Sequence, residues 1–177
     1  MFAFLDGETN MKIMGIDPGV ARVGFAFVEK NGHHVQPIQY GVIETPANTD
    51  HNDRLLTIFD TLHALIEKFT PDAMAIEKLF FNSNVTTAIA VGQARGVMLL
   101  AARQHQLEIA EYTPLQVKQA ICGYGQAEKK QVQEMVRRLL NLSQIPKPDD
   151  AADALAIAIC HAHAANWTRL KERSGNV

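Results

Sequence analysis

Short apolar runs in the chain predict strands. They cover residues 12–16, 22–29, 35–44, 72–76 and 107–112. The first run ends at Asp17-Pro18-Gly19, and Asn31-Gly32 separates the second from the third, so both breaks carry turn residues. Because only short turns join the first three runs, we expect an antiparallel meander, with two further strands that lie parallel in the same sheet.

Apolar residues at helical spacing predict the remaining elements. The clearest set is Leu55, Leu56, Phe59, Leu62, Leu65, Ile66 and Phe69, and further helices are expected over residues 84–104, 114–122, 128–142 and 149–167. Strands that alternate with helices favour an α/β fold with one mixed five-stranded sheet. We expect residues 1–10 to be an extension, residues 11–167 to form a single domain and residues 168–177 to form a polar tail.

Composition supports a single globular domain, but the average charge conceals an asymmetry. The chain has 177 residues, 47% hydrophobic and 20% charged, with a net charge of −2. Residues 1–77 carry eleven acidic and five basic side chains, whereas residues 112–147 carry six basic and two acidic ones. The balance excludes a protein that is evenly coated with positive charge, yet one basic segment remains available for a nucleic acid.

The chain shows no targeting or membrane signal. Its two cysteines, Cys122 and Cys160, have neither CxxC spacing nor a framework of pairs, which suits a reducing compartment. The N-terminus lacks a basic region before its apolar residues, and no apolar run reaches the ~20 residues of a membrane span. We therefore expect a cytoplasmic protein that does not contact membranes.

Four acidic residues are candidates for a shared site. Asp17 and Glu77 each end an apolar strand, and Asp150 and Asp153 lie three residues apart on one face of the last predicted helix. A turn aspartate, a solvated strand end and a helix N-terminus are alternative explanations for Asp17, Glu77 and Asp150. Asp153 fits them less well, since it lies inside an alanine-rich apolar helix where an unpaired carboxylate costs several kcal/mol.

A shared cation would explain all four acids together. Mg²⁺ takes oxygen ligands and binds through a few carboxylates and substrate phosphate. Two such ions ~4 Å apart stabilise the attacking and leaving oxygens in phosphodiester cleavage. The predicted strand order allows the first and fourth strands to be neighbours, so that the last helix could bring its two aspartates to Asp17 and Glu77.

Five short blocks occur in order along the chain: Gly15-Ile-Asp17-Pro-Gly19, Ala75-Ile-Glu77, Gly92-Gln-Ala-Arg-Gly96, Ala127-Glu-Lys129 and Asp150-Ala-Ala-Asp153-Ala-Leu-Ala. Together they resemble the RuvC family of bacterial Holliday junction resolvases. The resemblance runs from about Met11 to Trp167. Gly-x-Asp-Pro-Gly alone is a weak signal, because actin-like kinases and chaperones use a similar turn, whereas the ordered set is strong.

The resemblance implies a ribonuclease H-like fold, a homodimer and an endonuclease activity on DNA junctions. The family cuts two like-polarity strands of a four-way DNA junction symmetrically during recombination and repair. It uses Mg²⁺ or Mn²⁺, with two ions expected in each site, and leaves 5′-phosphate and 3′-hydroxyl ends. The family's four catalytic acids match Asp17, Glu77, Asp150 and Asp153. Physical partnership with the RuvA–RuvB branch-migration motor is also implied.

Three rival interpretations remain at this point. Another nuclease of the same superfamily, YqgF-type or transposase-like, is the nearest, although the block at residues 92–96 and the final Asp-x-x-Asp favour the RuvC type. An actin-like ATP-binding module normally needs two domains, for which 177 residues are too few. A non-catalytic junction-binding protein would not need all four acids.

The basic segment supplies candidate phosphate contacts. They are Lys118, Lys129, Lys130, Arg137 and Arg138. Such contacts give affinity and position without base recognition. The alternative is a solvated face with Glu128 and Glu134 as ion-pair partners, which is equally compatible with Arg137 and Arg138. Lys118 and Lys129 match family positions implicated in DNA binding and cleavage.

Two further features have both a structural and a functional interpretation. Phe80 and Phe81 follow Glu77 closely, and such a pair is usually part of a core, but Phe80 matches the family's aromatic that stacks on an unpaired base.

Gly92 and Gly96 lie on the second predicted helix, where small residues allow close packing. The partner of that helix is either the sheet or, as the resemblance implies, a second copy of the chain.

Overall fold

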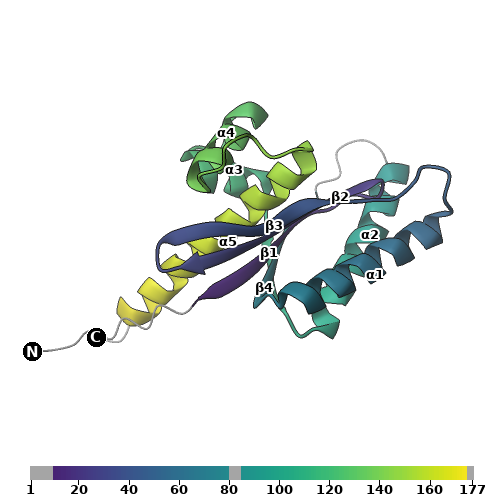
Figure 1. Ribbon diagram of the computed structural model, residues 1–177, viewed down its shortest axis with the longest axis horizontal. Coiled ribbons are helices and arrows are strands. Elements are labelled where there is room, and N and C mark those ends of the chain that lie inside the picture. Colours follow the sequence, from purple (N-terminus) through teal and green to yellow (C-terminus); the bar gives the residue numbers. More distant parts are fainter. Residues whose placement is uncertain (1–9, 80–84, 175–177) are drawn as a thin grey trace, which may run out of the picture.

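The computed structural model describes residues 10–79 and 85–174, without the side chains of residues 85, 86 and 165–174. Within these residues the strands form one sheet of order β3-β2-β1-β4-β5 (Figure 1). They are β1 (Met11–Asp17), β2 (Arg22–Asn31), β3 (His34–Glu44), β4 (Ala73–Glu77) and β5 (Glu108–Tyr112). The first three are antiparallel, while β4 is parallel to β1 and to β5. The predicted mixed sheet is confirmed.

Helices cover both faces of the sheet. They are α1 (His51–Phe69), α2 (Val85–Gln104), α3 (Pro114–Cys122), α4 (Lys129–Leu139) and α5 (Asp149–Ser174). Helices α1 and α2 pack on one face, and α3, α4 and α5 on the other (Figure 1). Helix α5 continues seven residues beyond the expected end at Trp167, because no glycine or proline interrupts residues 168–174. The expected N-terminal extension lies almost wholly outside the described residues.

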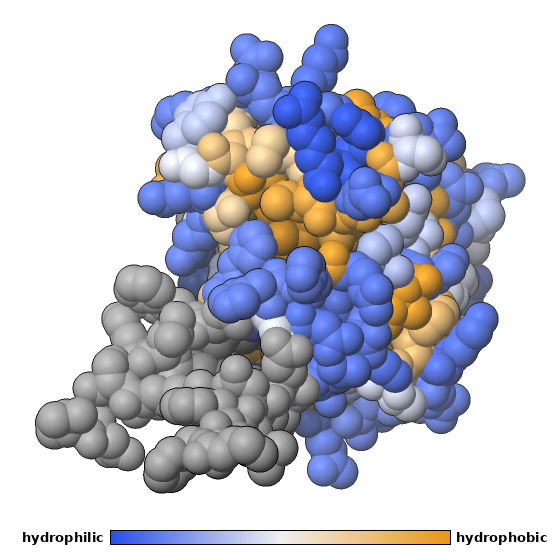
Figure 2. All heavy atoms as spheres, turned by 60° about the vertical axis from the view of Figure 1, so that its left-hand side comes forward, coloured by the Kyte–Doolittle hydropathy of each residue, from blue (hydrophilic) through white to orange (hydrophobic). Residues whose placement is uncertain are grey.

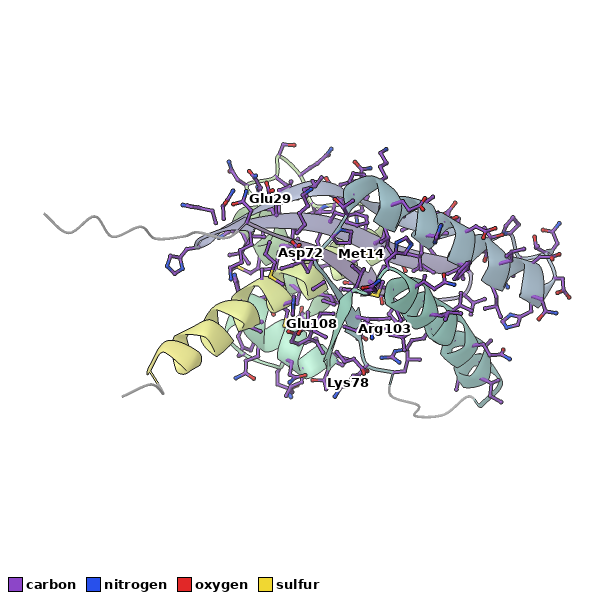
Figure 3. The ribbon with its side chains drawn as sticks, turned by 90° about the horizontal axis from the view of Figure 1, so that it is seen from below. Met14, Glu29, Asp72, Lys78, Arg103 and Glu108 are labelled. Atoms are coloured by element: carbon purple, nitrogen blue, oxygen red, sulfur yellow. The ribbon has the colours of Figure 1, made fainter. Side chains whose placement is uncertain are left out.

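Alternation along the central strands divides the core into two layers. Ile13 and Ala75 belong to the layer beneath α5, whereas Met14, Ile16 and Met74 belong to the layer beneath α1 and α2. Figure 3 shows Met14 on the sheet close to these two helices. All five side chains are fully buried. Packing on both faces therefore fixes the position of β1 and β4 relative to the helices, and it also fixes where these two strands end.

Helix α5 crosses the sheet in backbone contact. A Cβ atom on Gly15 would lie 2.2 Å from the Ala154 carbonyl oxygen, and one on Gly24 would lie 2.0 Å from the carbonyl oxygen of Asp150. Neither glycine could therefore carry a side chain without moving the helix. This close approach holds the first two turns of α5 over β1 and β2, which determines where Asp150 and Asp153 lie.

The described part of the face shown in Figure 2 is mostly hydrophilic and contains an apolar area bordered by hydrophilic residues. Large exposed apolar side chains occur on several elements: Ile38, Leu56, Ile89, Leu100, Leu115, Tyr124 and Leu139. Scattered exposed apolar residues are normal in globular proteins. In the part of the chain that the structure describes, no helix combines the length and apolar character that crossing a bilayer requires.

Candidate active site

The sheet register places two of the four predicted acids side by side. Ile16 of β1 is paired with Ile76 of β4 in parallel. Asp17 and Glu77 directly follow this pair and are the last residues of their strands. Because carboxyl ends of neighbouring parallel strands lie at one edge of a sheet, both side chains emerge there. The first and fourth strands are thus neighbours, as a shared site for Asp17 and Glu77 requires.

The start of α5 brings the other two acids to the same place. Asp150 lies in the first turn and Asp153 follows one turn later, so that both lie on the same side of the helix. The charges of Glu77, Asp150 and Asp153 all act on Asp17. The four acids therefore form one electrostatic cluster at the ends of β1 and β4, although they come from opposite ends of the sequence.

The carboxylates of the cluster carry more negative charge than the nearby basic side chains neutralise. Burial, followed by the neighbouring charges of Asp153, Glu77 and Asp150, raises the pKa of Asp17 to about 7. Burial, followed by the charge of Asp153, also raises the pKa of Glu77. The pKa of Asp153 is raised by burial even though Lys129 opposes the change. Additional positive charge would therefore bind favourably here.

Two basic side chains contact the cluster, each at a different acid. The Lys129 Nζ atom lies 3.0 Å from Asp153 Oδ2 and 3.6 Å from Asp149 Oδ2. The Arg22 Nη1 atom lies 3.6 Å from Asp150 Oδ2. Burial alone would lower the pKa of Lys129, but its hydrogen bond to Asp153 and the charges of nearby aspartates outweigh this, so the pKa is raised. Lys129 is thus held as a cation.

The chemistry of the four acids fits a hard divalent cation, whose preferred ligands are carboxylate oxygens. Among the described residues, however, no three acidic, histidine or cysteine side chains converge into a ready ligand cluster. The four acids do not converge in this way because Asp150 pairs with Arg22 and Asp153 pairs with Lys129, and both ion pairs draw the carboxylates toward a basic side chain. The charges of Asp153, Glu77 and Asp150 still add to the effect of burial in raising the pKa of Asp17, although Lys129 opposes them.

A cavity of about 270 Å³ opens beside the cluster. Its polar lining includes the acids Glu77 and Asp153 and the bases Lys118 and Lys129. Lys118 comes from α3, whose first turn is held by a reciprocal capping box between Thr113 and Gln116. The two lysines that match family positions thus share one cavity with two of the acids, and this geometry suits a phosphate group next to the carboxylates.

The other predicted basic residues lie elsewhere. Lys130 lines a separate groove with Tyr124 and Arg138. Arg137 and Arg138 both donate to Glu134 at 2.8 Å, and these hydrogen bonds lower the pKa of Glu134 to about 2.

The expected ion pairs of the two arginines with Glu134 are therefore confirmed. Phe80, the predicted stacking aromatic, lies outside the described residues.

Two arginines at the site were not anticipated. Arg22 contacts Asp150, and Arg95 of α2 donates to the Glu77 carbonyl oxygen at 3.4 Å and to the Glu111 carboxylate. Arg95 thereby ties the end of β4 to α2 and β5. It lies within the block at residues 92–96, so the sequence did offer a signal for it.

Comparison with known proteins decides the family. The sequence profile of the family described as Crossover junction endodeoxyribonuclease RuvC matches residues 13–161. The chain belongs to the RuvC family. A RuvC relative from Halothermothrix orenii is 58% identical over 159 residues, covering 90% of this chain and 96% of the relative. A RuvC relative from Desulfitobacterium hafniense is 58% identical over 156 residues, covering 88% of this chain and 94% of the relative.

Solved RuvC structures have the same architecture. The Thermus thermophilus RuvC structure has a TM-score of 0.83 at 36% identity, covering 89% of this chain and 97% of that one. The same protein in complex with Holliday junction substrate has a TM-score of 0.86, covering 89% and 96%. The yeast mitochondrial Holliday junction resolvase Ydc2, at 15% identity and a TM-score of 0.65, shares the fold alone. The fold of this RuvC family member is ribonuclease H-like.

Proposed function

We propose that this RuvC family member is a Holliday junction resolvase of the cytoplasm that acts in recombination and DNA repair. It makes paired symmetric nicks in like-polarity strands of a four-way junction and leaves 5′-phosphate and 3′-hydroxyl ends. Support comes from family membership and from similarity to a RuvC solved with Holliday junction substrate. The proposal includes association with the RuvA–RuvB branch-migration complex.

The observation that carries this proposal is the undercompensated acidic cluster at the ends of β1 and β4. Asp17, Glu77, Asp150 and Asp153 would hold Mg²⁺, or Mn²⁺ in its place, through their carboxylate oxygens. Two bound ions would supply stabilisation of the attacking and leaving oxygens of the phosphodiester. Family membership and the raised pKa of Asp17 both support a catalytic rather than a structural role for these acids.

The chain's own residues bind and orient the DNA. Lys118 and Lys129 line the cavity next to the acids, where they would hold the phosphates that flank the cleavage point. Lys130 on the separate groove would contact the backbone farther away. Phe80 would stack on a base that the opened junction leaves unpaired, which is worth ~1–3 kcal/mol.

A homodimer supplies the second active site that symmetric cleavage requires. Within the described residues, nothing lies within 4 Å of a Cβ atom built on Gly92 or Gly96, so these glycines are not explained by packing inside the chain. Ile89 and Leu100 on the same helix are 59% and 54% exposed. We propose that α2 packs against a second copy, because small residues and apolar side chains together favour close helix contact.

Separate Asp17→Asn and Asp153→Asn substitutions test the catalytic assignment. Each variant is incubated with a synthetic four-way junction and Mg²⁺, and its nicking rate is compared with that of wild type. We expect a loss of at least about 10³-fold, because removing a principal electrostatic contributor to the transition state costs this order of rate. Asp60→Asn, an exposed acid on α1, is the matched control and should cut normally. Near-normal cleavage by either site variant would show that the assignment is wrong.

A further inference from the structure

Arg22 joins the active site to the outer edge of the meander. It is the first residue of β2 and is paired across the sheet with Glu44 of β3. Its Nε atom lies 3.2 Å from Glu44 Oε1, while its Nη1 atom lies 3.6 Å from Asp150 Oδ2. The side chain is 49% exposed, so the guanidinium is shared between two acids and still accessible from solvent.

The contact of Arg22 with Asp150 can be replaced when a divalent cation and a DNA phosphate reach the site. An exposed ion pair at this distance is weak. A divalent cation bound by Asp150 would repel the guanidinium and reduce the attraction that holds it there. At the same time, an incoming DNA strand would bring phosphates to a side chain that already lies beside the carboxylates. A guanidinium is well suited to that exchange, because its planar fork binds carboxylate and phosphate with the same geometry.

Glu44 keeps the guanidinium at the site during such an exchange. The pair between Arg22 and Glu44 uses the Nε atom and follows from the antiparallel register of β2 and β3. It therefore does not depend on Asp150. When the Nη1 contact with Asp150 is released, the terminal nitrogens stay next to the acidic cluster. Lys129 approaches the same cluster through Asp153 and Asp149, so Arg22 and Lys129 contact different acids of it.

We propose that Arg22 is a DNA-phosphate ligand of this active site, and that it pairs with Asp150 until metal ions and DNA replace that contact. The inference rests on the proposed function and adds a second cation, besides Lys129, that holds the strand next to the carboxylates. Arg22 thus acts in two opposite ways: it weakens metal binding in the absence of DNA, and it strengthens binding of the junction.

The test measures both effects on the full chain. Mn²⁺ binding without DNA is followed by isothermal titration calorimetry, and junction binding in Ca²⁺ is followed by fluorescence anisotropy over a range of salt concentrations. Arg22→Gln should bind Mn²⁺ about two- to fivefold more tightly, since one competing ion pair is lost. It should bind the junction more weakly, with a salt slope reduced by about 1. Lys68→Gln, an exposed cation on α1, should change neither quantity.

The opposite signs distinguish a phosphate ligand from a structural residue. A variant that is merely misfolded should lose affinity for both Mn²⁺ and DNA. Arg22→Lys keeps the positive charge, so the proposal predicts that its salt slope of junction binding is close to that of wild type. Unchanged Mn²⁺ affinity together with an unchanged slope in Arg22→Gln would overturn the role of Arg22, as would a failure of Arg22→Lys to recover the slope. Absence of both Mn²⁺ and junction binding in wild type would instead contradict the proposed function itself.

Discussion

Replacing Asp17 by asparagine should stabilise the metal-free protein while it abolishes cleavage. The carboxylate of Asp17 is destabilised in the fold by burial and by the charges of Asp153, Glu77 and Asp150. Asparagine has nearly the same shape but cannot ionise, so the substitution removes the unfavourable charge and leaves the packing of β1 unchanged. The gain in stability should depend on pH, because it appears once the pH rises above the pKa that the wild-type carboxyl group has in the unfolded chain.

The size of the gain follows from the pKa. Folding raises the pKa of Asp17 from 3.8 to about 7. Between these values the folded chain binds the proton more tightly than the unfolded chain, so the free energy of unfolding falls as pH rises. The wild-type penalty is about 2 kcal/mol at pH 5 and about 4 kcal/mol at pH 8, at 1.36 kcal/mol per pKa unit. At pH 8 this corresponds to roughly 10 °C in Tm for a chain of this length.

Thermal unfolding in EDTA from pH 5 to 8.5, followed by circular dichroism, measures this difference directly. The Tm of Asp17→Asn should exceed that of wild type by an amount that grows with pH, whereas Asp60→Asn should track wild type throughout. Adding Mg²⁺ at pH 8 should narrow the gap, because ligand binding stabilises the wild-type fold. A Tm difference that is independent of pH, or a less stable Asp17→Asn at pH 8, would refute the electrostatic account of the cluster.

Three further substitutions test the packing, the DNA contact and the dimer. Gly24→Ala should lower the free energy of unfolding in urea by about 1–3 kcal/mol and impair cleavage, because the new Cβ would lie 2.0 Å from the Asp150 carbonyl oxygen. Lys118→Ala should reduce the salt slope of junction binding by about 1, and an unchanged slope would exclude a phosphate contact. Ile89→Asp should produce a monomer by light scattering, whereas Leu56→Asp, equally exposed on α1, should not.

The sequence predicted the order of elements and the position of the acids because both depend on local patterns. Asp17 and Glu77 each terminate a continuous apolar run, and a run of this kind is buried in the centre of a sheet. Their proximity required only that β1 and β4 be neighbours. The expected end of α5 at Trp167 is too early, because the polar residues after it, which resemble a tail, are all compatible with a helix and α5 continues to Ser174.

The contacts between side chains could not be predicted in the same way. Arg22 and Asp150 are far apart in the sequence, and they meet only because Gly15 and Gly24 let α5 lie directly on the sheet. Arg137 and Arg138 follow Glu134 by three and four residues, so their ion pairs were foreseeable as an alternative to DNA contacts. Only the three-dimensional structure separates these arginines, which pair with Glu134, from Lys118 and Lys129, which line one cavity with Glu77 and Asp153.

Mapping of strand cuts on a synthetic four-way junction tests the central claim most directly. The wild-type protein is incubated with the end-labelled junction in Mg²⁺, beside a linear duplex of the same sequence and a sample with EDTA. The account predicts paired nicks at symmetric positions in two like-polarity strands, which DNA ligase can reseal without further processing. Equal cutting of the linear duplex, cutting in EDTA, or nicks that cannot be resealed would contradict it.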